Sequence, residues 1–390
     1  MRIAECFAPV DALVVPLVSR RPVPVHDRQY AVAVKSAPTN NRLTWAIRVF
    51  FGAFPPGVRR VLAGRPVQRD GQTLDPDLQL LLRLGRLTAR RAPAATVQSR
   101  RQQLDVGGPL TGGPVAPGVA VREITVTADD HRPDLPCRLY TPDGVMPGSA
   151  LLVYFHGGAW VTGSLISHDS LCRFLAAHAG VRVLAVGYRL APEHPFPAAV
   201  DDAAAAFAYA REHAAELGAD PAAIAIGGDS AGGGLAAVVA HLAVRAGRPA
   251  PAFLLMFYPH VDTAGRSFSR DLFATGFGLT DSDIEWFTDQ YLPAGIDRGD
   301  PRVSIALAED LSGMPPTYLA TGGFDPLRDE GEMLARRMAE AGVAVILRRE
   351  PDLMHGFANL LGISARCREA VAQATGALRV GLAFAVARAD

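Results

Sequence analysis

The sequence predicts an α/β fold, in which helices flank a mostly parallel sheet of eight strands. Three observations support this fold class. From about Val119 onward, short apolar runs of β type alternate with longer helical segments. A Gly-x-Ser-x-Gly pentapeptide stands between one such run and one such segment. Finally, 49% of the 390 residues are hydrophobic and 20% are charged, so the chain has enough apolar surface for a large core.

The runs that we expect to form strands are apolar, four to six residues long, and fit one sheet. They are Val121–Val126, Cys137–Tyr140, Ala150–Phe155, Arg182–Val186, Ile224–Gly227, Phe253–Phe257, Thr317–Ala320 and Val343–Leu347. Helical segments separate most of the later runs, among them Ala198–Leu217, Ala231–Ala246 and Glu330–Ala341. Strands that are joined through a helix usually pair in parallel, so we expect crossover connections.

Composition and pattern divide the chain into an arm with an amphipathic helix (1–73), helices and a linker (74–118), and the main α/β domain (119–390). In the arm, apolar residues recur at helical spacing from Leu43 to Phe54, and Pro55 then stops the pattern. A second helix is expected to start near Leu74. The stretch from Gly107 to Pro117 is rich in Gly and Pro and is therefore expected to be a linker.

Charge and cysteine usage disfavour several classes of protein. The 39 basic residues balance 39 acidic ones, so no chain-wide basic field exists to hold nucleic acid. Four widely spaced cysteines form no Cys-x-x-Cys pair, which argues against a zinc site, a thioredoxin motif and a disulfide framework. We therefore expect a reducing, cytoplasmic location. No apolar run reaches the roughly 18 residues that a membrane-spanning helix needs.

The arm allows two interpretations. Residues 1–110 hold 17 basic and 7 acidic side chains, a surplus that the rest of the chain offsets. In the favoured interpretation, the helix from Leu43 to Phe54 packs its apolar face on the rest of the protein. In the other, this helix rests on an anionic membrane surface and makes the protein peripheral to the membrane. The sequence also leaves open whether the chain forms a homodimer.

Ser230 is the candidate nucleophile. It is the centre of Gly228-Asp229-Ser230-Ala231-Gly232, which follows an apolar run and precedes a helical segment. Small residues two positions either side let the chain turn sharply and lift the hydroxyl above the sheet edge. The start of the following helix also places the Ala231 amide where an oxyanion would form. An ordinary glycine-rich turn, or a phosphate loop, is the alternative, but the Gly-Lys-Ser/Thr ending of a phosphate loop is absent.

A second glycine motif supports the first. His156-Gly157-Gly158-Ala159-Trp160 directly follows an expected strand. Without side chains, Gly157 and Gly158 can bring their backbone amides close to a substrate oxygen, where negative charge develops. We expect these two amides to join that of Ala231 in an oxyanion hole, and His156 to orient the loop.

The base and the acid must lie on loops after later strands. His355 follows the last expected strand and is preferred among the ten histidines, although position alone does not dismiss His260. Asp325 comes shortly after the strand Thr317–Ala320 and is preferred over Asp352. Asp329 and Glu330 stand at a helix start, where acidic residues complement the helix dipole. The order Ser230, Asp325, His355 is that of an α/β-hydrolase.

These motifs resemble the hormone-sensitive lipase family of α/β-hydrolases, in particular bacterial esterases with a Gly-Asp-Ser-Ala-Gly elbow. Tyr188-Arg-Leu-Ala-Pro-Glu-His-Pro-Phe-Pro and Asp325-Pro-Leu-Arg-Asp-Glu-Gly are similar to two further family segments, and the resemblance covers roughly residues 74–384. It implies an α/β-hydrolase fold with a helical cap, built from the N-terminal helices and an insertion around 267–298. The chain departs from the family at Ala159, where a third glycine is usual, and at Gly234, where asparagine is frequent.

Together these observations predict hydrolysis of carboxylic esters through an acyl-serine intermediate, with a small-molecule ester as substrate and no metal or organic cofactor. A closed cap favours short to medium acyl chains. Aromatic residues of the insertion are candidates for the acyl pocket or for the core of the cap: Phe268, Phe273, Phe277, Trp286 and Tyr291. The alternatives are a lipase that acts on longer chains at an interface, an amidase, and, more remotely, a receptor without catalytic activity.

Overall fold

The computed structural model of the protein describes residues 51, 54–89, 96–127 and 133–389. The chain divides into two units, residues 1–39 and 40–390, and every described residue belongs to the second. Most of the helix expected from Leu43 to Phe54 lies outside the described residues, although Phe51 is helical and buried.

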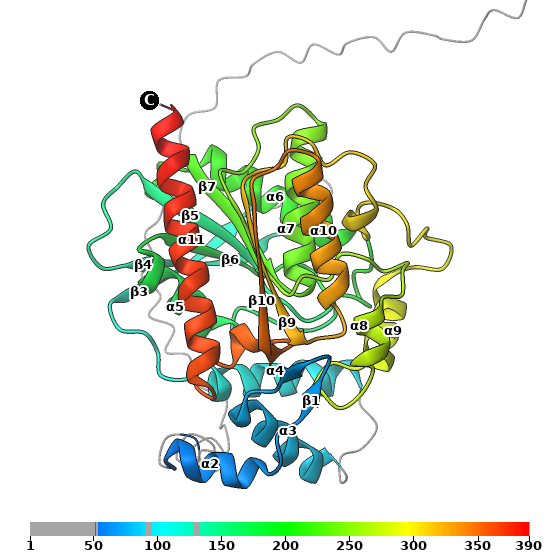
Figure 1. Ribbon diagram of the computed structural model, residues 1–390. Helices are drawn as coiled ribbons and strands as arrows, with labels where there is room; N and C mark the ends of the chain where they lie inside the picture. Colours follow the sequence, from blue (N-terminus) through cyan, green and yellow to red (C-terminus); the bar gives the residue numbers. More distant parts are fainter. Residues whose placement is uncertain (1–50, 52–53, 90–95, 128–132, 390) are drawn as a thin grey trace, which may run out of the picture. The chain divides into compact units, whose positions relative to one another are not determined.

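The main sheet has eight strands in the order β10-β9-β8-β7-β5-β6-β4-β3 (Figure 1). Their bounds are β3 Val119–Val126, β4 Leu135–Pro142, β5 Ser149–Phe155, β6 Arg182–Val186, β7 Ala219–Asp229, β8 Leu254–Phe257, β9 Thr317–Phe324 and β10 Val345–Met354. All pairings from β10 to β6 are parallel, whereas β4 is antiparallel to both of its neighbours. The predicted sheet is confirmed, and each predicted strand overlaps an observed one.

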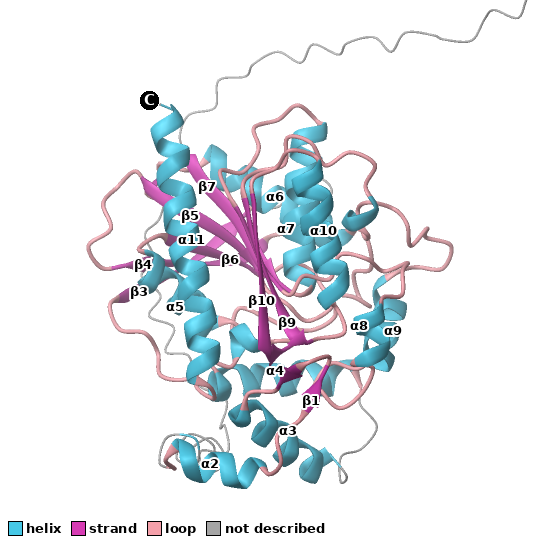
Figure 2. Ribbon diagram, in the orientation of Figure 1, coloured by secondary structure: helices cyan, strands magenta, loops and turns pink. Residues whose placement is uncertain are grey.

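Helices cover both faces of this sheet (Figure 2). On one face lie α5 (Asp169–Ala179) and α11 (Ala365–Ala389), which pack against each other. On the other lie α6 (Ala198–Glu212), α7 (Ala231–Arg245) and α10 (Arg328–Glu340). No helix among the described residues has the length and apolar character that crossing a membrane requires.

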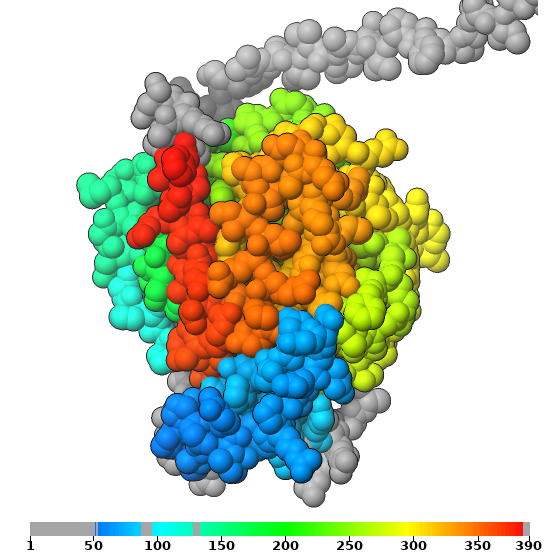
Figure 3. All heavy atoms as spheres, viewed as in Figure 1, coloured from blue at the N-terminus to red at the C-terminus, as the bar shows by residue number. Residues whose placement is uncertain are grey.

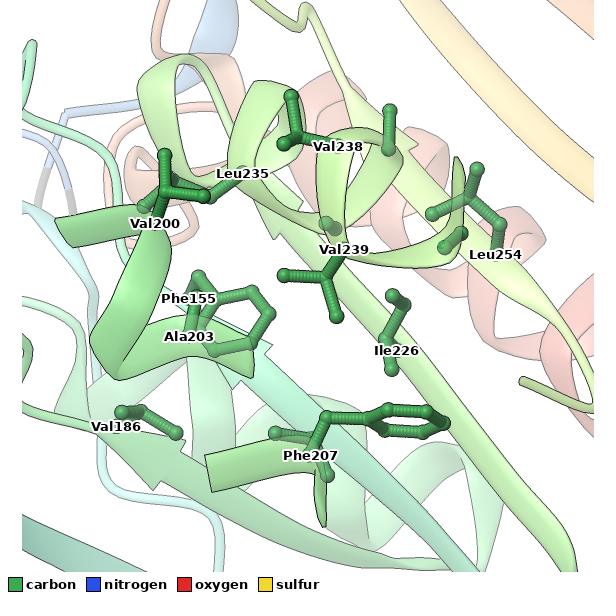
Figure 4. Packing of buried hydrophobic residues seen from close by; sticks show 14 of the residues in the cluster. Phe155, Val186, Val200, Ala203, Phe207, Ile226, Leu235, Val238, Val239 and Leu254 are labelled. Atoms are coloured by element: carbon green, nitrogen blue, oxygen red, sulfur yellow. The ribbon is translucent and has the colours of Figure 1, made fainter. Parts of the chain in front are cut away.

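Strand periodicity divides the core into two clusters. Because successive strand side chains point to opposite faces, Val153 belongs to the cluster under α6 and α7, and Tyr154 to the one under α5 and α11. Figure 4 shows the first cluster, in which Val239 of α7 and Phe207 of α6 lie over Ile226 of β7. Burying a large apolar side chain of this kind contributes about 1.5–3 kcal/mol. The core therefore fixes the central strands, whose carboxyl ends carry the candidate site.

Two segments come together outside the sheet, and we call them the cap. One contains α2 (Pro56–Ala63), the hairpin β1 (Gln68–Arg69) and β2 (Gln72–Thr73), α3 (Pro76–Ala89) and α4 (Val97–Thr111). The other contains α8 (Phe268–Leu272) and α9 (Asp281–Tyr291). Arg100 of α4 joins them, because its Nη2 lies 2.8 Å from Asp283 Oδ1 and its guanidinium 4.7 Å from the centre of the Trp286 ring. Figure 3 shows the N-terminal part in blue beside the yellow-green insertion.

One expectation about the first segment is wrong. The stretch from Gly107 to Pro117 is not entirely a linker, because α4 continues through its first five residues to Thr111. Gly108 is needed for close packing instead: a Cβ there would lie 2.1 Å from the Ser167 carbonyl oxygen. The prolines that end the helical pattern of the arm also begin a new helix, since Pro56 is the first residue of α2, where its missing N–H has no cost.

Candidate active site

Ser230 stands at the sharp turn between β7 and α7. Its backbone has φ +52° and ψ −124°, a strained conformation of the kind found at functional sites. The flanking glycines permit the turn. A Cβ on Gly232 would lie 2.0 Å from the Phe155 carbonyl oxygen, and one on Gly228 would lie 2.4 Å from the Gly232 carbonyl. The Ser230 residue is half-buried, and its hydroxyl is held at the carboxyl edge of the sheet.

His355 and Asp325 complete a chain of hydrogen bonds with this hydroxyl. His355 follows β10, and its Nε2 lies 3.0 Å from Ser230 Oγ. Its Nδ1 lies 2.8 Å from Asp325 Oδ2, which favours the tautomer with the proton on Nδ1 and a free lone pair on Nε2. Asp325 is fully buried, and its other oxygen accepts the Leu327 amide at 2.8 Å. The structure therefore brings together the three residues that the sequence suggested as nucleophile, base and acid.

The glycine loop after β5 requires a correction. The Gly157 amide, expected in the oxyanion hole, instead donates to the carboxylate of Asp229, with N···Oδ1 3.0 Å. Within the described part of the chain, the amides of Gly158, Ala159 and Ala231 have no acceptor. Gly158 and Ala159 are half-buried, and Ala159 has φ +54°, in the left-handed region where the family's usual glycine is less strained. The Ala159 amide is therefore available to a ligand, whereas that of Gly157, which the prediction named, is already bonded to Asp229.

His156 contacts the backbone of the glycine loop, as expected for a residue that orients it. Its Nδ1 lies 2.8 Å from the Gly157 carbonyl oxygen. Its ring stacks on that of Tyr188, with centroids 4.3 Å apart, and the Tyr188 hydroxyl donates to the His156 carbonyl oxygen at 2.7 Å. Burial, together with the nearby His168, lowers the pKa of His156 to about 3, so the ring is neutral.

His260, which position alone left open, does not contact the nucleophile's hydroxyl. The residue is 5% exposed, and its ring centre lies 5.0 Å from that of Trp160. Its Nε2 is buried and has no hydrogen-bond partner among the described residues. Burial, followed by the charges of Arg270 and His355, lowers the pKa of His260 to about 3. This histidine is therefore a neutral residue beneath the site.

Several aromatic side chains that were candidates for an acyl pocket are packed into the core. Phe273 is fully buried and packs against Phe277 and Phe324, with ring centroids 5.4 and 5.6 Å away. Tyr291 is 1% exposed and stacks on Trp160 at 4.4 Å. Phe268, in contrast, is 65% exposed.

The insertion also contacts the loop that carries Asp325. The Ser269 hydroxyl of α8 donates to the Pro326 carbonyl oxygen at 2.9 Å, and the Ser269 amide donates to Asp329 Oδ2 at 2.8 Å. Asp329 therefore binds the start of α8, besides standing in the first turn of α10 where the sequence placed it. These bonds join the second cap segment directly to the residue after Asp325.

Asp229 and Asn359 were not identified from the sequence as part of the site. Asp229 is 2% exposed, and its carboxylate accepts the Asn359 side-chain amide with Nδ2···Oδ2 3.0 Å. The available signal was a carboxylate next to the nucleophile at the end of an apolar strand, because a buried charge must be satisfied. Among the described residues, no group of three or more His, Cys, Asp or Glu side chains is arranged to hold a metal ion.

A family model described as the alpha/beta hydrolase fold matches residues 152–359. The carboxylic ester hydrolase LipN of Mycobacterium tuberculosis is 44% identical, over 84% of this chain and 89% of that protein. The ethyl acetate hydrolase of Pseudomonas putida is 38% identical, over 79% of this chain and 99% of that protein.

Solved structures agree with these relatives. The ester-hydrolase EH1AB1 from the metagenome of Lake Arreo, solved with a derivative of bipyridine phosphonate, has a TM-score of 0.74 and 37% identity. The similarity covers 79% of this chain and 98% of that one. A hyperthermophilic esterase from the archaeon Pyrobaculum calidifontis has a TM-score of 0.73 and 35% identity over the same shares.

Proposed function

The chain belongs to the hormone-sensitive lipase-like family of α/β-hydrolases, and from this premise we propose that it is a serine carboxylesterase that uses Ser230, His355 and Asp325. The observation that carries the proposal is the chain of hydrogen bonds Ser230 Oγ to His355 Nε2 to Asp325 Oδ2, at 3.0 and 2.8 Å. These distances are within the range in which a base can take the proton of a nucleophile.

In the first half of the reaction, Ser230 Oγ attacks the ester carbonyl carbon while His355 Nε2 takes its proton. Asp325 stabilises the imidazolium that forms. The carbonyl oxygen becomes an oxyanion, for which the amides of Gly158, Ala159 and Ala231 are the proposed donors, because none of the three bonds to another described residue. When the tetrahedral intermediate collapses, the carbon–alkoxide bond breaks and His355 gives its proton to the departing alcohol.

In the second half, water repeats the attack on the acyl-serine. His355 takes a proton from the water, and the hydroxide oxygen bonds to the acyl carbon. Collapse of the second intermediate breaks the bond to Oγ, returns the proton to Ser230 and releases the carboxylic acid. The sum is one ester and one water converted into one alcohol and one acid.

We propose short to medium acyl chains as substrates. Two observations support this preference: the large aromatic residues Phe273 and Tyr291 of the insertion fill space in the core, and a relative is named for ethyl acetate. A series of p-nitrophenyl esters from acetate to palmitate tests it. We expect kcat/KM to be highest at acetate to hexanoate, with nearly all turnover lost in Ser230→Ala. Faster hydrolysis of an emulsified long-chain triglyceride than of soluble butyrate would favour a lipase instead.

We also propose that the arm packs on the protein rather than on a membrane, and that the enzyme works in a reducing compartment. Phe51, near the end of the expected helix, is 4% exposed, which supports packing. Cys172 and Cys367 are buried and free, as in a reducing compartment. Deletion of residues 1–41 should leave esterase activity intact, whereas deletion through Phe54 should lower thermal stability. Co-sedimentation of the intact chain, but not of the longer deletion, with anionic vesicles would contradict the packing.

A further inference from the structure

One buried carboxylate lies directly behind the candidate site and takes no part in the proton transfers. Asp229 precedes Ser230 at the end of β7 and is 2% exposed. Its Oδ1 accepts the Tyr154 hydroxyl at 2.9 Å and the Gly157 amide at 3.0 Å. Its Oδ2 accepts the Asn359 amide at 3.0 Å. A carboxylate has about four lone-pair sites, and at least three of them are used here.

These partners come from the loops that carry the reacting groups. Gly157 precedes Gly158 and Ala159 in the loop after β5. Asn359 lies in the short 3-10 helix Phe357–Asn359, four residues after His355. Asp229 itself is bonded covalently to Ser230. A single side chain therefore links the nucleophile turn, the oxyanion loop and the loop of the base.

Further contacts come from the loops after β5 and β8. Tyr258, which follows β8, has its hydroxyl 3.4 Å from Asp229 Oδ2 and its ring centre 4.8 Å from that of His355. His168 Nε2 lies 3.3 Å from Asp229 Oδ1. Burial alone would raise the pKa of Asp229, but the charge and hydrogen bond of His168 and the hydrogen bond of Tyr154 outweigh it and lower that pKa. The group is therefore a buried carboxylate anion that is satisfied by neighbours on every side.

The glycine at position 157 fits this contact. A Cβ there would lie 2.6 Å from Asp229 Oδ2, so any side chain would push the carboxylate away from the loop. Gly157 thus permits the loop to approach Asp229, and the donation of its amide to Oδ1 fixes how the next two amides are turned. This is a different role from that of an oxyanion donor.

We propose that Asp229 is a positioning residue, which sets the orientation of the Gly158 and Ala159 amides and of the His355 loop relative to Ser230. The inference rests on the proposed function and goes beyond it, because Asp229 touches no reacting atom. Its contribution is to the transition state, in which the oxyanion needs donors at about 2.7–3.1 Å. The binding of the uncharged ester depends much less on Asp229.

The experiment compares Asp229→Ala and Asp229→Asn with the wild type in the full chain. We expect Asp229→Ala to lower kcat for p-nitrophenyl butyrate about 10²-fold, as loss of one oxyanion donor does, with KM changed less than about threefold. Affinity for a trifluoromethyl ketone, which forms a tetrahedral oxyanion on Ser230, should fall by a similar factor. Asp229→Asn keeps one oxygen for Gly157 and Tyr154 but turns an N–H toward the Asn359 amide. We therefore expect this variant to lose roughly tenfold in kcat and in ketone affinity.

Glu350→Gln is the matched control. Glu350 of β10 is fully buried and paired with Arg348 of the same strand and with Arg366 of α11, and it contacts neither the oxyanion loop nor the three reacting residues. This variant should lower the melting temperature and leave both kcat and ketone affinity unchanged. If the Asp229 variants behave like the control, Asp229 has only a structural role and the proposal is wrong.

Should Asp229→Ala not fold, the isosteric Asp229→Asn decides by the same measure: retention of wild-type ketone affinity overturns the proposal, and a roughly tenfold loss supports it. A wild type without esterase activity would overturn the proposed function itself, and this inference with it. An active wild type whose Asp229 variants keep their rates would overturn only the inference.

Discussion

His260 should make the enzyme less stable as the pH falls below about 6.5. A histidine in an unfolded chain takes up a proton near that pH, whereas the buried ring of His260 has a pKa of about 3 in the folded protein. Between these values the unfolded state binds one proton more than the folded state. Stability therefore rises with pH through this window and is lost as the pH falls.

The size of the effect follows from the gap between the two pKa values. Each pH unit below 6.5 removes about 1.4 kcal/mol from the free energy of unfolding, until the pH reaches the folded-state pKa. At pH 5 the gap is about 1.5 units, which corresponds to about 2 kcal/mol. A loss of this size is a substantial part of the 5–15 kcal/mol that holds a typical domain together.

The assay is urea unfolding of the wild type and of His260→Gln at pH 7.5 and at pH 5. Glutamine does not titrate, and all other ionisable groups are shared, so their contributions largely cancel in the difference between the two proteins. The wild type and the variant will differ in free energy of unfolding at pH 7.5 by some amount. At pH 5 this difference should have shifted by about 2 kcal/mol in favour of the variant. An advantage that is equal at both pH values would refute the reasoning, because His260 would then bind its proton equally well in both states.

Three further substitutions test other parts of the structure. Ser230→Ala should lower kcat by on the order of 10⁴- to 10⁶-fold and leave the melting temperature nearly unchanged; turnover of an activated ester by the purified variant near the wild-type rate would be incompatible with its role. Gly232→Ala should prevent folding or abolish activity, because its Cβ would lie 2.0 Å from the Phe155 carbonyl oxygen, whereas Gly376→Ala on α11, with no atom within 4 Å, should fold normally. Arg101→Met removes bonds of 2.8 Å to two backbone carbonyls, so calorimetry should show a loss of about 1–3 kcal/mol, and an unchanged melting temperature would contradict this.

The sequence was sufficient to predict the sheet because strand periodicity and buried runs are local properties. It was less informative about strand ends, which depend on pairing. Gly322 and Gly323 have the composition of a turn, yet they continue β9, since Gly322 pairs with Glu350 of β10. Nothing near Gly322 in the sequence reveals a partner that lies 28 residues later.

The candidate site, like the fold, could be predicted from the sequence only in part. Strand-to-loop positions led to Ser230, Asp325 and His355, and the structure brings these three side chains within hydrogen-bond distance of one another. The choice of oxyanion amides was different, since every residue of the loop has an N–H group. Only the position of Asp229 reveals that the Gly157 amide is already used, which is why we propose the Ala159 amide in its place.

The long separation between partners in this molecule has a consequence for its synthesis. His355 follows Ser230 by 125 residues, and Asp283 follows Arg100 by 183. At about 5–20 residues per second, a ribosome needs roughly 6 to 25 s to travel from the nucleophile to its base. α4 is therefore made before α9, whose Asp283 binds Arg100, and the serine is made before the histidine that is proposed to activate it. The proposed triad is thus complete only after residue 355 of the 390-residue chain has been made, and we expect hydrolysis to begin only then.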